Sequence, residues 1–122
     1  MLQKISRILI VIAWLFFIFI LSNIPDEDFG PPLFSWQGLV AHLIIYAVLA
    51  YLLLRAILSW AKTKSVNWQT VFGIIAFCLF YGITDEYHQS YVIGRSASLI
   101  DLGFDGLGGA VGAVLFWLKK QR

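Results

Sequence analysis

The sequence predicts an all-α membrane protein of four transmembrane helices, with both termini in the cytoplasm. Three observations lead to this prediction: the composition, four long apolar runs and an uneven distribution of basic residues. Hydrophobic residues make up 60% of the 122 residues and charged residues 13%. A soluble domain of this length needs more polar side chains to cover its surface. We expect a single transmembrane domain over residues 1–122.

Each apolar run is long enough to cross a bilayer, which takes about 20 predominantly apolar residues. The first run stops at Pro25, and the second is interrupted near its end by Arg55, whose long side chain can reach the interface. The third is uncharged up to Thr84, and the fourth carries Asp101 and Asp105 in its first half. The predicted helices cover residues 5–24, 38–60, 67–89 and 98–118.

The distribution of charge predicts which end of the bundle faces the cytoplasm. All but one of the nine Lys and Arg residues lie near the termini or near the connection between the second and third helices, and the exception is Arg95. Lys and Arg accumulate on the cytoplasmic side of membrane proteins. The seven acidic residues lie toward the opposite end: Asp26, Glu27, Asp28, Asp85, Glu86, Asp101 and Asp105. We expect Trp60, Trp68 and Trp117 at the inner interface and Trp36 at the outer one.

Polar side chains from three of the helices are expected at one depth of the membrane. Ionisable groups inside a span are costly, so each of them needs an explanation. At a rise of about 1.5 Å per residue, His42, Glu86, Asp101 and Asp105 all reach the outer quarter of a hydrocarbon core about 30 Å thick. This convergence predicts a polar cluster near the outer face.

The helix faces agree with such a cluster. The two aspartates of the fourth helix share a face with Gly108 and Gly112, whose spacing allows another helix to approach closely. On the third helix we expect Glu86 and Gln89 on one face and Asp85 on the adjoining one. The inner halves of the spans carry no acid, histidine or buried base, which argues against a path for ions or protons.

The cluster is open to four interpretations. Arg95 can form a buried ion pair with Glu86 or Asp101 that fixes the helix packing. A carboxylate can act as a general acid or base, with His42 or Arg95 stabilising charge. His42, His88 and the carboxylates can bind a divalent metal. Finally, the cluster can bind a lipid-linked or peptide ligand at the outer surface.

A series of short motifs runs through the same residues in this order: Glu86-x-x-Gln89, Gly94-Arg95, Asp101-x-x-x-Asp105 and Gly108-x-x-x-Gly112. This order resembles the signature of the VanZ-like family, and His42 with Tyr46 resembles the H-x-x-x-Y motif on that family's second helix. The family often has Asp-Lys shortly before this histidine, where the chain has Gly38 and Leu39. Many members also have proline where Ile93 stands.

The family takes its name from a protein associated with resistance to the glycopeptide antibiotic teicoplanin, so the resemblance implies work at the bacterial cell envelope. We therefore expect a multi-pass protein of the bacterial cytoplasmic membrane that acts on, or binds, a lipid-linked envelope component at the outer leaflet. The alternative is a non-catalytic membrane factor whose buried charges bind a lipid headgroup or stabilise a partner protein. Nucleic acid is not an expected partner, and we assign no cofactor.

The expected site combines catalytic and binding residues. In an enzyme, Glu86 or Asp101 is the acid or base. Arg95 holds a phosphate or carboxylate of the substrate, and His42 stabilises charge or positions the substrate. The candidate binding residues are Gln89, Asp105, Tyr46 and Asp85. We assign no metal ligand from the sequence.

Overall fold

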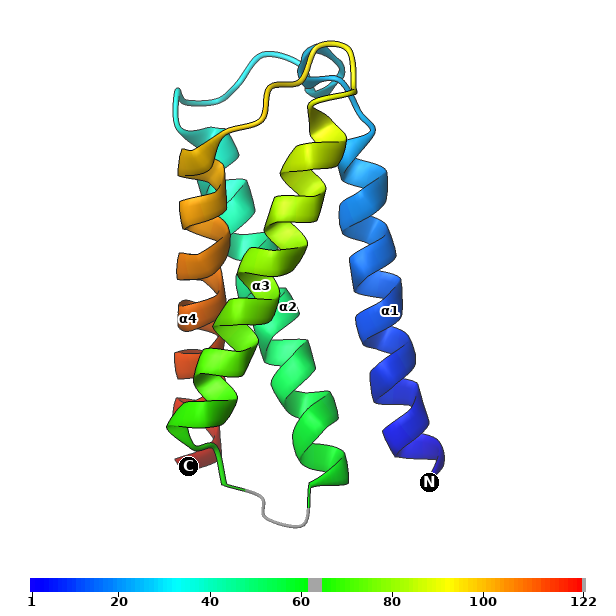
Figure 1. Ribbon diagram of the computed structural model, residues 1–122, viewed down its shortest axis with the longest axis vertical. Coiled ribbons are helices and arrows are strands. Elements are labelled where there is room, and N and C mark those ends of the chain that lie inside the picture. The colour runs from blue at the N-terminus through cyan, green and yellow to red at the C-terminus, as the bar shows by residue number, and fades with distance from the viewer. Residues whose placement is uncertain (62–64, 122) are drawn as a thin grey trace.

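The computed structural model describes residues 1–61 and 65–121, which form four long helices and one short 3₁₀ helix (Figure 1). In chain order these are α1 (Leu2–Ser22), η1 (Asp26–Phe29), α2 (Gln37–Trp60), α3 (Trp68–Gln89) and α4 (Leu99–Gln121). These two ranges contain no strand. The helices run along the long axis of the molecule, and the N- and C-termini lie at the same end (Figure 1).

Each of the four α-helices is long and apolar enough to cross a membrane. This confirms the predicted all-α fold with four spans. The difference at α1 is instructive: this helix begins at Leu2 and ends at Ser22, whereas the predicted range was 5–24. Asn23 caps the helix, and Pro25 follows shortly afterwards. Proline cannot donate a helical hydrogen bond, so the chain leaves the helix before it.

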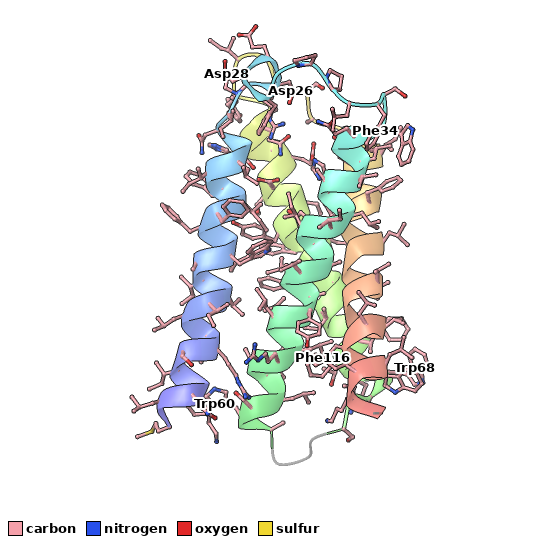
Figure 2. All side chains as sticks on the ribbon, turned by 180° about the vertical axis from the view of Figure 1, so that it is seen from behind. Asp26, Asp28, Phe34, Trp60, Trp68 and Phe116 are labelled. Carbon is pink, nitrogen blue, oxygen red and sulfur yellow. The ribbon has the colours of Figure 1, made fainter. Side chains whose placement is uncertain are left out.

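The two ends of the bundle carry different side chains. Figure 2 shows Trp60 and Trp68 at the end that holds the termini, which we call the basic end, and Asp26 and Asp28 at the other, which we call the acidic end. At the basic end the ammonium group of Lys4 lies 5.1 Å from the centre of the Trp60 ring. Three further basic residues lie outside the described residues: Lys62, Lys64 and Arg122.

Helices α2 and α4 pack backbone to backbone along a stripe of glycines on α4. A Cβ atom added to Gly108 would lie 2.5 Å from the carbonyl oxygen of Leu43, and one added to Gly112 would overlap the carbonyl oxygen of Ala47. Only glycine allows so close an approach. The buried core surrounds this contact and comprises mainly Tyr46, Leu49, Ala50, Leu54, Ile74, Cys78 and Ala113.

Helix α1 is the least buried of the four. Two hydrogen bonds join its middle to the rest of the bundle: the indole nitrogen of Trp14 donates to the carbonyl oxygen of Ile45 at 3.0 Å, and the Tyr81 hydroxyl donates to the carbonyl oxygen of Leu15 at 2.7 Å. Exposed apolar side chains such as Phe16 cover its outer face, which suits contact with lipid tails.

Candidate functional site

The centre of the acidic end is a hydrogen-bonded pair between α2 and α4. The Nδ1 atom of His42 lies 2.8 Å from Oδ1 of Asp105, whose side chain is 0% exposed. Space for this carboxylate comes from α3, because a Cβ atom added to Gly82 would lie 2.5 Å from Oδ2 of Asp105. Three helices therefore shape the environment of one aspartate.

Asp101 completes the predicted pair of carboxylates on α4. Its Oδ2 atom lies 4.0 Å from Nε2 of His42, and its side chain is 23% exposed. His42 thus lies between two carboxylates from one helix face, with the inner one hydrogen-bonded to Nδ1. A buried aspartate bound to Nδ1 also orients the histidine of serine-hydrolase triads, where Nε2 then transfers the proton. The arrangement is suited to acid–base chemistry at Nε2 of His42.

Glu86 joins α3 to the start of α4. Its Oε2 atom accepts a hydrogen bond from the backbone nitrogen of Ser98 at 2.7 Å, just before the first residue of α4. The Oε1 atom of Glu86 is buried, and no donor in the described part of the chain reaches it. Oε2 of Glu86 therefore holds the start of α4, and Oε1 is free to bind a further group.

Three side chains lie close enough together to be candidate ligands of one metal ion. His42, Glu86 and Asp105 each offer one ligand atom, and these atoms all lie within 4.8 Å of one another. His88, which the sequence also allowed as a ligand, lies elsewhere: its Nε2 atom is 3.0 Å from Oδ1 of Asn23. The suggestion that His88 and His42 bind one metal ion together was therefore wrong.

A second polar network joins α3 to α1. The Oδ1 atom of Asp85 accepts a hydrogen bond from the Ser22 hydroxyl, and its Oδ2 atom accepts one from the Gln89 amide at 3.0 Å. The prediction that Gln89 lies with Glu86 was wrong. Residues four apart on a helix diverge by only about 40° and residues three apart by about 60°, so Gln89 follows Asp85 toward α1.

Sequence reasoning missed Ser22. This residue is 1% exposed, and its hydroxyl oxygen also lies 3.1 Å from the carbonyl oxygen of Ile18, which is the alternative acceptor for its one proton. The only signal in the sequence was a small polar residue at the end of an otherwise apolar helix. Such a residue is common at helix ends, because it can cap them.

Arg95 pairs with a residue that we did not expect. Its Nη1 atom lies 2.6 Å from Oδ1 of Asp26, and its Nη2 atom donates to the carbonyl oxygen of Leu21 at 3.3 Å. The expected ion pair with Glu86 or Asp101 is therefore replaced by one with the acidic loop.

The path of the loops explains this choice. Gly94 adopts a φ of 83°, which favours glycine, and its carbonyl oxygen accepts a hydrogen bond from the backbone nitrogen of Asp26 at 3.4 Å. The loop before α4 thus lies against the segment after α1. Asp26 is 62% exposed and is bound to Arg95.

A cavity of about 40 Å³ connects the two networks. About 10–15 Å³ is enough for one water molecule, so this space admits a small polar group. Its polar lining comes from α1, α2, α3 and the loop before α4: Ser22, His42, Tyr46, Asp85, Gln89 and Arg95. Five of the eight predicted site residues therefore meet around one cavity. The other three, Glu86, Asp101 and Asp105, do not line it but lie next to His42.

Unpaired polar atoms single out the same region. Within residues 1–61 and 65–121, four buried side-chain atoms have no hydrogen-bond partner: Oη of Tyr46, Oε1 of Glu86, Nε of Arg95 and Oδ2 of Asp105. All four belong to predicted site residues. Buried polar atoms are paired in the large majority of cases, so a group of unpaired ones in one place needs an explanation.

Two larger grooves lie toward the basic end. They measure about 490 and 520 Å³, and among the described residues neither is lined by an acid, a histidine or a cation. Gly73 and Phe77 line the first, and Trp68 and Trp117 line the second. Their lining suits contact with lipid tails rather than catalysis or metal binding, so the candidate site remains at the acidic end.

One known family matches most of the chain. The sequence profile described as VanZ/LLP1 matches residues 7–120. No curated protein and no solved structure matches the chain. The matched segment covers α2 and α3 completely, most of α1 and α4, and every residue of the candidate site. The chain belongs to the VanZ/LLP1 family.

Proposed function

We propose that this protein binds the polar headgroup of a membrane lipid or a lipid-linked cell-envelope component at the outer leaflet of the bacterial cytoplasmic membrane. The observation that carries the proposal is a pair of unpaired buried atoms on residues that line one small cavity. Tyr46 and Arg95 line the cavity and contribute an unpaired Oη and an unpaired Nε. A ligand group that bonds to these atoms compensates for their burial.

The chemistry of the lining suits a headgroup that carries both donors and acceptors. The guanidinium group of Arg95 favours a phosphate or carboxylate, although its Nη1 atom is already bound to Asp26. His42 and the carboxylates behind it favour hydroxyl or amine groups. The cavity has space for one such group, so the rest of the headgroup lies at the surface of the bundle, with its tails along the apolar helix faces.

Orientation is part of this proposal. The basic residues at the end of the termini support a cytoplasmic location for that end, which directs the cavity outward. Single cysteines introduced near Asp28 and Ser90 are expected to react with a membrane-impermeant thiol reagent on intact cells, and cysteines near Arg122 are not. The native Cys78 is 0% exposed and adds little background. The reverse labelling pattern contradicts action at the outer leaflet.

Tyr46→Phe is the sharpest variant for testing headgroup binding. It removes one hydroxyl that has no partner among the described residues and leaves the ring in place. We expect the variant to be at least as stable as the wild type, because an unpaired buried hydroxyl costs about 1–3 kcal/mol. The lipid that copurifies in mild detergent, measured by mass spectrometry, is expected to decrease.

Arg95→Gln extends the same experiment. Hydrogen bonds to charged groups contribute about 1.5–3 kcal/mol, so headgroup binding is expected to weaken about tenfold or more. Arg95→Lys is expected to retain only part of the headgroup binding, since an ammonium group cannot reproduce the paired hydrogen bonds of a guanidinium group. Tyr51→Phe and Arg55→Gln, which lie toward the basic end of α2, serve as matched controls. Equal lipid retention by the wild type and the cavity variants contradicts the proposal.

Acid–base catalysis on the bound headgroup is a second candidate function. It is favoured by the 2.8 Å contact between His42 and Asp105, with Asp101 close to the other ring nitrogen. In this version His42 transfers the proton, Asp105 orients the His42 ring, and Arg95 holds an anionic group of the substrate. Turnover of a headgroup by the wild type but not by His42→Gln, with teicoplanin susceptibility as the cellular readout, distinguishes this function from binding alone.

A further inference from the structure

The carboxylates behind His42 carry more negative charge than the surrounding cations balance. Glu86 and Asp105 are 7% and 0% exposed, and Asp101 lies on the same side of the bundle. Arg95, which among residues 1–61 and 65–121 is the only Lys or Arg at the acidic end, is bound to Asp26. Burying several ionised carboxylates next to one histidine is unfavourable unless they take up protons or a further positive charge joins them.

We propose that His42, Glu86 and Asp105 bind a divalent transition metal of the Zn²⁺ class. Their ligand atoms come from three helices and lie within 4.8 Å of one another. Oε1 of Glu86 and Oδ2 of Asp105 are buried and have no partner among the described residues, so two acceptors remain after the hydrogen bonds have formed. These unpaired atoms distinguish the site from an ordinary group of acids.

The set of donors determines the class of metal. Imidazole and carboxylate ligands suit zinc and neighbouring transition metals, whereas Mg²⁺ and Ca²⁺ prefer oxygen ligands alone. Zinc bonds to nitrogen and oxygen are about 2.0–2.2 Å long, so the three ligands must move together by on the order of 1 Å. Glu86 has freedom to do so, because only its Oε2 atom is held, by Ser98.

Three protein ligands leave a coordination position open, as in catalytic zinc sites. Asp101 is the nearest further carboxylate, at 4.0 Å from Nε2 of His42, and it is partly exposed. A water molecule or an oxygen atom of a ligand can reach the metal from that side. The metal site shares His42 with the lining of the cavity. Zinc binding does not require a bound headgroup, because Tyr46 and Arg95 contribute no ligand to the metal.

Metal binding can be measured directly on the full chain. The protein is purified in detergent without a histidine tag, stripped with a chelator and titrated with Zn²⁺, with bound metal counted by elemental mass spectrometry. We expect one Zn²⁺ per chain. Changes to groups that merely support metal ligands cost about 10–100-fold in affinity, so His42→Gln, Glu86→Gln and Asp105→Asn are each expected to weaken binding by about 100-fold or more.

Two matched controls keep the test specific. His88→Gln and Glu27→Gln remove the same side-chain types at the same end of the bundle and are expected to bind zinc as the wild type does. If Asp105→Asn does not fold, Glu86→Gln decides, because its amide oxygen can still accept the Ser98 hydrogen bond. No zinc bound by the wild type, equal binding by the ligand variants, or preferred binding of Ca²⁺ or Mg²⁺ overturns the proposal.

Discussion

Two neighbouring carboxylates on α3 have opposite surroundings. Asp85 faces α1, and both of its oxygens are hydrogen-bonded, one by Ser22 and the other by Gln89. Glu86 faces α4, and only one of its oxygens has a partner within the described chain. Both residues are 7% exposed. Burial alone therefore does not separate a structural acid from a candidate ligand-binding acid; the number of satisfied oxygens does.

The difference has a physical meaning. A fully bonded polar network stabilises one arrangement of helices, here the attachment of α1 to α3. A partly bonded network lowers stability, and natural proteins retain such sites mainly where function requires them. We therefore interpret the Asp85 network as structural and the group around His42 as functional.

The largest expected effect comes from the helix contact that supports the functional group. Gly112→Leu forces a side chain into the carbonyl oxygen of Ala47. Overpacking costs about 1–3 kcal/mol and occasionally more, and backbone cannot yield as a side chain can, so we expect a loss of about 3 kcal/mol or more. Circular dichroism during thermal unfolding in detergent measures it. Gly103→Leu, with nothing within 4 Å, is the control, and equal melting of the two variants would show that this face of α4 contacts lipid.

The next effect tests the fully hydrogen-bonded network around Asp85. Asp85→Leu removes both acceptor oxygens, so the buried amide of Gln89 loses its 3.0 Å partner and the Ser22 hydroxyl keeps only the carbonyl oxygen of Ile18. An unpaired buried group of this kind costs about 1–3 kcal/mol. A cycle with Ser22→Ala, measured by the same unfolding assay, is expected to give a coupling of about 0.5–3 kcal/mol. Additive effects would mean that the two side chains do not cooperate.

The smallest effect concerns the ion pair between the loops. Asp26 is 62% exposed, and pairs at the surface contribute about 0–1 kcal/mol. Asp26→Asn is therefore expected to lower the free energy of unfolding by less than about 1 kcal/mol, and Asp28→Asn by even less. A larger loss in chemical denaturation for Asp26→Asn would show that this pair, rather than the glycine turn at Gly94, fixes the loops.

The sequence predicted the helices well, because length and apolar composition decide which segments can cross a membrane. It also predicted that His42, Asp101 and Asp105 meet, since depth follows from the rise of a helix and the glycine stripe identifies the buried face of α4. The contact between α2 and α4 could be predicted from these two features alone, without knowing the path of the loops.

The contacts that the sequence did not predict depend on loops, on helix ends or on small angular differences. The pairing of Arg95 with Asp26 depends on the turn at Gly94, which brings together segments far apart in the chain. The direction of Gln89 depends on the difference between residues three and four apart. The hydrogen bond of Ser22 depends on where α1 ends, two residues before the predicted end.

The most direct test of the central claim is the melting temperature of Glu86→Gln, measured in detergent beside the wild type and Asp85→Leu. The Glu86→Gln substitution keeps an oxygen for the Ser98 hydrogen bond and removes one of several clustered carboxylates. If the group around His42 is a ligand site and the Asp85 network is structural, Glu86→Gln melts at or above the temperature of the wild type, while Asp85→Leu melts below it. A decrease for Glu86→Gln as large as that for Asp85→Leu would contradict this account, because both carboxylates would then serve the fold.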